Sequence, residues 1–315
     1  MQLFPLIKGM ATYIPFLYDP RRGETGGSTN ARYCYSVWLR HLRTMSKVCG
    51  PVQMQRVAEL GPGDSIGIGL AAMLSGVNHL ESLDVVRYAS ASRNQAIFRE
   101  LVGLFRSRTP IPGDAEFPDL QPRLTDYEFP EDLLPESRLA ELLEPRRIDA
   151  IEAALAGNAS AVSLDYHVPW NARDLRCGAH IDVLYSQAVL EHVEDLEDAH
   201  CILASFMRPG GIAIHAIDFR SHCITPGWDG HLQYSPAIWQ LVKGRRPYLL
   251  NRKSPTEQLA ALTQAGFEVM AEIRSRSDPT LARGARAAAF RDWSDIDRET
   301  TSMTVVARRA DCRHG

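Results

Sequence analysis

Two alternating glycines that directly follow a short apolar segment are the feature that most constrains how this chain folds. Residues 57–60 read Val-Ala-Glu-Leu, and Gly61-Pro-Gly63 leads from them into apolar residues at helical spacing over 66–74. Glycine lets the backbone turn tightly and approach a ligand closely. The pattern therefore predicts a nucleotide-cofactor site at the carboxyl end of a first parallel strand.

The residues around the glycines restrict which cofactor this site can take. A dinucleotide fingerprint needs a third glycine three residues after the second, where this chain has Ile66. A carboxylate at Glu59 would repel a pyrophosphate, whereas it suits a cationic ligand that has a free amine and no phosphate. S-adenosylmethionine fits that description, and we expect Glu59, Gly61 and Gly63 to bind it.

A second apolar strand ends in an acid. Residues 79–83 read His-Leu-Glu-Ser-Leu, and Asp84 and Val85 follow them. An acid about twenty residues beyond the glycines is where this kind of fold holds a ribose diol by paired hydrogen bonds. We therefore predict that Asp84 and its neighbour Val85 contribute to cofactor binding.

Residues 181–215 have the pattern of a strand–helix–strand unit. The apolar run 181–186 is followed by a helical stripe that ends near Phe206, and Pro209-Gly-Gly211 stops that helix before the apolar run 212–215. A parallel pair of strands joined by a helix is the repeating unit of α/β proteins. Ser186, at the end of the first of these strands, is a further candidate for cofactor binding.

Three of these motifs resemble, in order and spacing, those of class I S-adenosylmethionine-dependent methyltransferases. They are Glu-x-Gly-x-Gly-x-Ser at 59–65, Leu-Glu-His-Val at 190–193 and Arg-Pro-Gly-Gly at 208–211. Ser65 stands where family members frequently have a third glycine. The resemblance implies an α/β, doubly wound sheet of seven mostly parallel strands, Rossmann-like, with an antiparallel strand at its C-terminal edge.

The resemblance extends, more loosely, to a third strand. Val168-Pro-Trp170 is similar to the short element that follows the adenine-contacting acid in this superfamily. Asp165 is therefore the candidate for contact with the adenine amine, although its offset is one residue short. A simple loop acid is the alternative interpretation of Asp165.

The chain divides into a cap, a main domain and an insertion. We expect residues 1–50 to form an N-terminal helical cap and residues 51–315 a methyltransferase domain. The proline-rich segment 107–147 interrupts the strand–helix alternation, as a functional lid or a poorly ordered insertion does. Near the C-terminus, Ser254-Pro-Thr-Glu257 predicts a capping box that begins a helix.

Composition narrows the possible partners. The chain has 315 residues, 45% of them hydrophobic, with a formal net charge of -3, which does not favour binding to nucleic acid. No apolar run approaches the ~20 residues that span a bilayer. The six cysteines lack the paired spacing of a zinc site, and we expect reduced thiols in a cytoplasmic protein.

Histidines and an aspartate cluster where this fold carries out chemistry. Methyl transfer to a hydroxyl usually needs a base, and Asp218 could orient His222 for that role, with His192 as the competing candidate. A divalent metal held by Asp218, His222 and His231 is conceivable. Because such loop residues are common without a metal, we predict none.

For the acceptor, the sequence indicates only a broad chemical class. The aromatic and polar segment 218–252 looks like that of bacterial methyltransferases found among polysaccharide-biosynthesis enzymes, which implies O-methylation of a sugar, a glycan or another small hydroxylated acceptor. The alternatives are an N- or C-methyltransferase acting on a small metabolite, and a non-catalytic binding module. An NAD-dependent oxidoreductase is a further alternative, against which Ile66 and Glu59 argue.

Overall fold

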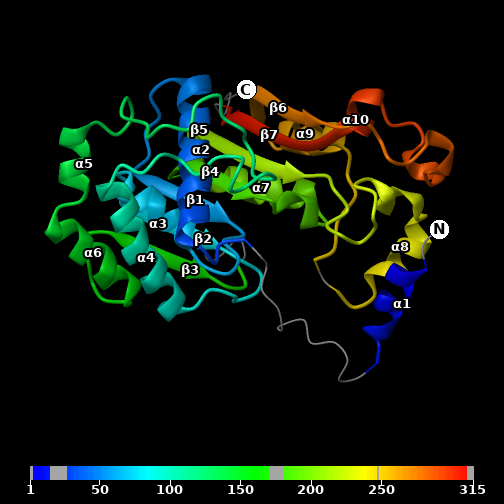
Figure 1. The fold of residues 1–315 in the computed structure, drawn as a ribbon, viewed down its shortest axis with the longest axis horizontal. Coiled ribbons are helices and arrows are strands. Elements are labelled where there is room, and N and C mark those ends of the chain that lie inside the picture. Colours follow the sequence, from blue (N-terminus) through cyan, green and yellow to red (C-terminus); the bar gives the residue numbers. More distant parts are fainter. Residues whose placement is uncertain (1–2, 15–26, 171–179, 247, 311–315) are drawn as a thin grey trace.

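One seven-stranded sheet organises the molecule. The computed structural model describes residues 3–14, 27–170, 180–246 and 248–310, and its strands lie in the order β3-β2-β1-β4-β5-β7-β6 (Figure 1). They are β1 (Arg56–Leu60), β2 (His79–Leu83), β3 (Ser163–His167), β4 (Ile181–Gln187), β5 (Met207–Asp218), β6 (Phe267–Arg276) and β7 (Thr300–Arg309).

The pairing of the strands confirms the predicted fold class. β1 to β5 pair in parallel, whereas β7 runs antiparallel to both β5 and β6. The sheet is thus mostly parallel, with antiparallel pairing at the edge built by the C-terminal part of the chain. Its order reverses at β1, which lies between β2 and β4, and such a switch point leaves a crevice at the carboxyl ends of the strands.

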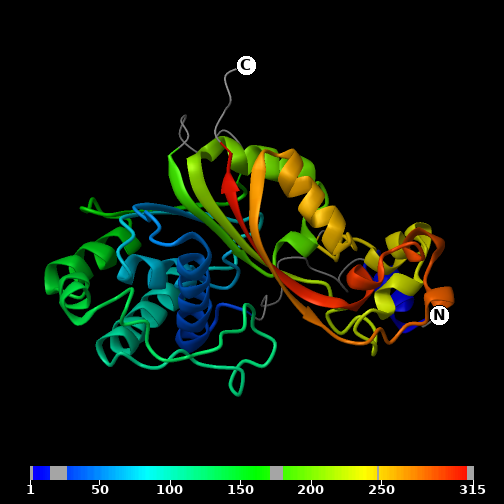
Figure 2. The ribbon, with the colours of Figure 1, turned by 90° about the horizontal axis from the view of Figure 1, so that it is seen from above.

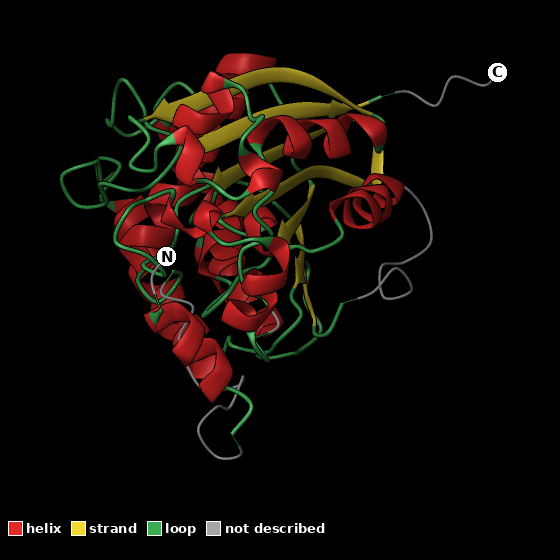
Figure 3. Ribbon diagram, turned by 90° about the vertical axis from the view of Figure 1, so that its right-hand side faces the viewer, coloured by secondary structure: helices red, strands yellow, loops and turns green. Residues whose placement is uncertain are grey.

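Helices cover both faces of the sheet (Figure 2, Figure 3). On one face α2 (Ala31–Cys49), α3 (Gly67–Leu74) and α4 (Ala91–Arg106) contribute to the larger apolar core. On the other, α7 (Leu196–Phe206) and α9 (Pro255–Gln264) pack in a second core. The predicted capping box starts α9, where Ser254 Oγ accepts the Glu257 backbone N–H at 3.1 Å.

The two helices that the structure describes within the first 50 residues lie in different places in the fold. Helix α2 is buried in the larger core, whereas α1 (Phe4–Ala11) packs against α8 (Pro236–Lys243), at the opposite end of the molecule from α5 and α6 (Figure 1). Gly9 allows this close packing, because a Cβ there would lie 2.1 Å from the backbone oxygen of Leu241. Helix α10 (Asp295–Glu299) precedes β7.

The proline-rich segment lies between β2 and β3 and is firmly attached. It runs from α4 through a loop to α5 (Glu136–Leu142) and the start of α6 (Pro145–Leu155). Six of its apolar side chains are buried in the larger core: Ile111, Leu120, Phe129, Leu134, Leu139 and Leu142. The alternative of a poorly ordered insertion therefore does not describe this segment, whose side chains complete the core over α2.

A buried guanidinium ties this loop to α2. Arg40 has no exposed surface, and its Nη atoms donate to the backbone oxygens of Leu120 (2.8 Å), Pro112 (3.1 Å) and Pro122 (3.2 Å). Asp114 supplies a partial counter-charge at 3.2 Å. The Arg40 side chain thereby donates hydrogen bonds to backbone oxygens of the loop that lie outside the helices and strands.

None of the helices in the described part of the chain has both the length and the apolar character that a membrane crossing requires.

Replacing Arg40 tests this anchor. Arg40→Ala leaves buried backbone oxygens without a donor, and we expect the free energy of unfolding to fall by about 3–5 kcal/mol. Arg43→Ala is the matched control, because Arg43 pairs with the exposed Asp126 and such surface pairs contribute at most about 1 kcal/mol. Urea unfolding measures both variants. Equal losses in the two would contradict the anchoring role of Arg40.

Candidate functional site

A cavity of about 1000 Å³ opens at the carboxyl ends of β1, β2 and β4. Of the predicted site residues, six line it: Gly61, Gly63, Asp84, Val85, His192 and His222. The cavity thus brings together residues from the glycine turn, the end of β2 and the segments after β4 and β5. The other predicted residues, which are Glu59, Asp165, Ser186 and Asp218, do not line it.

The glycine turn forms one wall and requires glycine at both positions. Gly61 and Gly63 have φ angles of 68° and 71°, in the left-handed region that side chains disfavour. A Cβ at Gly61 would also lie 2.6 Å from Cγ2 of Val189, which lines the opposite wall. The backbone of β1 can therefore reach the cavity surface only because these residues lack side chains.

Asp84 supports the turn from the end of β2. Its carboxylate accepts the backbone N–H groups of Val85 at 2.7 Å and Gly63 at 3.3 Å, and the residue is 6% exposed. Burial raises the pKa of Asp84, while the backbone donors oppose that rise. The acid predicted to hold a ribose therefore also fixes the position of Gly63.

Glu59 lies beneath the turn and outside the cavity. Successive strand residues point to opposite faces, so Leu60 lines the cavity while Glu59 faces α3. Its Oε2 is 3.1 Å from the position that a Cβ of Gly69 would occupy, and only 1% of the residue is exposed. Burial raises the pKa of Glu59 to about 8. The structure thus separates this carboxylate from the ligand space in which it was expected.

Two more predicted contacts are also set back from the cavity. Ser186 has no exposed surface, and its Oγ is 2.8 Å from Nδ1 of His215 on β5. Asp165 lies within β3, where it pairs in register with Glu81 of β2. Gln187 takes the place expected for Ser186 in the cavity wall, one residue further along β4.

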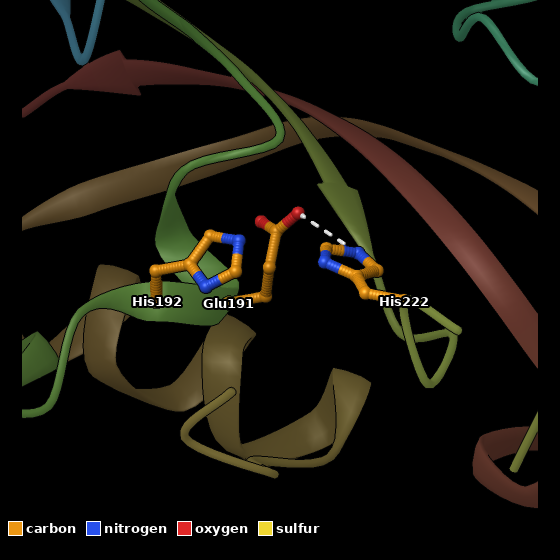
Figure 4. A group of neighbouring side chains, drawn as sticks. All are labelled: Glu191, His192 and His222. Carbon is orange, nitrogen blue, oxygen red and sulfur yellow. Dashed lines mark ion pairs between the residues drawn. The ribbon is translucent and has the colours of Figure 1, made fainter. Parts of the chain in front are cut away.

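The far end of the cavity is formed by two histidines, and the side chain of a glutamate lies between their rings (Figure 4). His192 ends the short helix η1 (Leu190–His192), and His222 follows β5 in a left-handed conformation with φ 48°. Their ring centroids are 5.2 Å apart. Glu191 Oε1 lies 3.9 Å from Nε2 of His222, and donor atoms of all three residues lie within 4.8 Å of one another.

Asp218 holds His222 from behind. It is the last residue of β5, and its Oδ2 lies 3.4 Å from Nε2 of His222 and 2.7 Å from Nη2 of Arg220. Burial would raise the pKa of Asp218, but His222 and Arg220 outweigh it and hold that pKa below the usual range. The carboxylate is thus ionised and lies beside the imidazole of His222.

Glu191 is the residue of this cluster that the sequence-based reasoning did not single out. It is 3% exposed, and burial, reinforced by Asp218, raises its pKa well above the usual value. Burial lowers the pKa of His192 to about 4. The available signal was the adjacency of Glu191 and His192 directly after β4. His231, the third member of the conceivable metal set, is instead buried against Trp239, with ring centroids 6.3 Å apart.

No family model and no curated protein sequence matches this chain. Among solved structures it is similar to an S-adenosylmethionine-dependent methyltransferase from Mesorhizobium loti (16% identity, TM-score 0.42, 86% of this chain and 98% of that chain). It is also similar to an S-adenosylmethionine-dependent methyltransferase from Methanosarcina mazei, with 13% identity and a TM-score of 0.39 over 82% of this chain and 95% of that chain.

A third similar structure is phosphoethanolamine N-methyltransferase 2 from Haemonchus contortus in complex with S-adenosyl-L-methionine. It has 12% identity and a TM-score of 0.44 over 94% of this chain and 61% of that chain. At such identities and TM-scores the likeness carries no argument about individual site residues.

The enclosed position of Glu59 predicts how stability depends on pH. The folded chain keeps a proton on Glu59 up to about pH 8, whereas the unfolded chain releases it above its ordinary pKa of 4.5. Stability is therefore fully present below that ordinary pKa and is lost as pH rises toward the folded pKa, by up to about 1.4 kcal/mol per pH unit.

Glu59→Gln removes this loss, because glutamine does not ionise. Its free energy of unfolding, relative to the wild type, should rise between about pH 5 and about pH 8 in urea titrations. Glu100→Gln, at an exposed position of α4, is the control that should show no such trend. A constant difference between Glu59→Gln and the wild type across this range would place Glu59 in contact with solvent or ligand.

Proposed function

We propose that this chain is an S-adenosylmethionine-dependent methyltransferase that methylates an oxygen of a sugar or another small hydroxylated acceptor. The observation that carries the proposal is a single cavity with two chemically different ends. One end has the glycine turn and Asp84, and the other has His192 and His222. A donor and an acceptor bound at these ends would meet inside one cavity.

The residues at the first end suit a nucleoside with a charged amino-acid tail. Asp84 offers carboxylate oxygens to a ribose diol, and Gly61 and Gly63 expose backbone at the surface of the cavity. Val85 and Trp170 add apolar surface on the same side, against which an adenine ring can pack. The fit rests on a cavity that a side chain at Gly61 would obstruct.

The residues at the second end suit a hydroxyl acceptor. S-adenosylmethionine supplies a methyl group that its sulfonium has already activated, so the chain mainly has to position the acceptor and exclude water. His222, oriented by Asp218, accepts the hydroxyl proton as the acceptor oxygen attacks the methyl carbon. His192, neutral near pH 7 because burial lowers its pKa, can hydrogen-bond to the same acceptor.

Methyl transfer by variants of this pair tests the proposal. With methyl-labelled S-adenosylmethionine and a panel of saccharides, His222→Ala should lower the transfer rate on the order of 10²–10⁴-fold and leave cofactor affinity unchanged. Asp218→Asn should lower the rate less, because the imidazole remains and only its orientation weakens.

His79→Ala is the matched control. His79 lies at the opposite end of β2, where its Nδ1 is 2.9 Å from Ser163 Oγ, and its loss should not affect transfer. Wild-type rates in both His222→Ala and Asp218→Asn would reject the assignment of the base. Labelling of nitrogen-containing acceptors alone would reject O-methylation and leave the cofactor assignment standing.

A further inference from the structure

We propose that Glu191, His192 and His222 bind one divalent transition-metal ion, such as Zn²⁺, at the acceptor end of the cavity. The proposal rests on the donor atoms of this chain alone. It holds whether or not the proposed methyl transfer is correct.

The three side chains converge on one point from two segments of the chain. Figure 4 shows the Glu191 carboxylate between the two imidazole rings, one from η1 and the other from the segment after β5. Glu191 Oε1 and His222 Nε2 are 3.9 Å apart, and the donor atoms of the whole set span no more than 4.8 Å. Ligands about 2.0–2.2 Å from one zinc ion lie roughly 3–3.5 Å from one another, so small side-chain rotations would complete the geometry.

The hydrogen bonding around Glu191 gives an independent reason to expect a cation. Both carboxylate oxygens are buried without a side-chain hydrogen-bond partner among the described residues, and the side chain is only 4% exposed. The groups near them that lower the pKa of Glu191 by hydrogen bonding are the backbone N–H groups of Glu191 and Asp218. Leaving buried carboxylate oxygens incompletely satisfied is costly, and a bound cation compensates acceptor atoms that face one another.

The donor set indicates the class of ion. Two imidazoles and one carboxylate suit zinc and its neighbours among the transition metals, whereas magnesium prefers oxygen ligands. Three protein ligands leave a coordination position open, as in catalytic zinc sites. His192 and His222 line the cavity, so an ion held by them lies next to the space assigned to the acceptor.

One further carboxylate lies beside the cluster. Asp218 Oδ2 is 3.4 Å from His222 Nε2 and is ion-paired with Arg220, which keeps it in place. An ion held by His222 occupies an imidazole nitrogen that would otherwise be available for a proton. The metal-loaded chain is therefore expected to bind an oxygen ligand directly at the ion.

The test measures metal binding without cofactor or acceptor. After removal of metal with a chelator, Co²⁺ is titrated into the full chain and followed by visible absorption, and Zn²⁺ is titrated by calorimetry. We expect one ion per chain. Each of Glu191→Gln, His192→Ala and His222→Ala should weaken binding at least about tenfold, since even residues that only support a ligand change metal affinity by this much.

Two control variants test whether other potential ligands of the chain bind the ion, one next to the cluster and one far from it. Cys223→Ser removes the exposed thiol next to His222, and His167→Ala removes an imidazole that pairs with Glu81 at 2.8 Å on a different part of the sheet. Both variants should bind the ion as the wild type does. Glu191→Gln keeps the shape of the side chain, and thermal unfolding in chelator confirms that each variant is folded.

Unchanged binding in the three cluster variants, or binding lost in Cys223→Ser, would overturn the proposal. Zn²⁺ should also raise the melting temperature of the wild type and not that of Glu191→Gln. Cofactor affinity is measured separately in the presence of chelator. If the chain does not bind S-adenosylmethionine, the proposed function is rejected, whereas the result for the metal ion is unaffected.

Discussion

The reversal of strand order at β1 is the constraint on which the rest of the site depends. Because β2 and β4 flank β1 and their following segments turn to opposite faces, a crevice remains at the carboxyl ends of these strands. The glycine turn keeps that crevice open. Its left-handed backbone at Gly61 and the absence of a Cβ allow Val189 to approach from β4 without closing the space.

The two ends of the cavity are built by different means. Backbone forms the first end, with Asp84 fixing it through hydrogen bonds to main-chain N–H groups. Side chains form the second end, and residues distant in the sequence hold them in place. Asn251 donates to the backbone oxygens of Leu190 and Val193, both at 2.7 Å, and so fixes the short helix that presents His192.

Backbone strain is concentrated around the second end. Ala188, His222 and Cys223 have φ angles of 54°, 48° and 58°, which cost roughly 1–2 kcal/mol for each residue other than glycine. Such conformations persist where the surroundings impose them. Asp218 holds the His222 ring at 3.4 Å, which links this strain to the position of an imidazole in the cavity wall.

Sequence patterns predicted the sheet and the glycine turn after its first strand because the controlling signals are local. Apolar runs, the glycines after β1 and the acid after β2 each describe one segment and its immediate turn. Glu59 and Ser186 were misplaced relative to the cavity because strand alternation and packing decide which face a side chain occupies. The approach of His222 to Glu191 and the burial of Arg40 depend on contacts between segments far apart in the sequence, which no local pattern records.

The most direct test of the central claim is calorimetric titration of S-adenosylmethionine into the wild type, Asp84→Ala and Asp84→Asn. The account predicts one site in the wild type and a loss of about 1–3 kcal/mol, or roughly 5–150-fold in affinity, in Asp84→Ala. Asp84→Asn should lose less, because its amide oxygen can still accept the backbone N–H groups of Val85 and Gly63. Wild-type affinity in a folded Asp84→Ala variant would contradict the placement of the cofactor in this cavity.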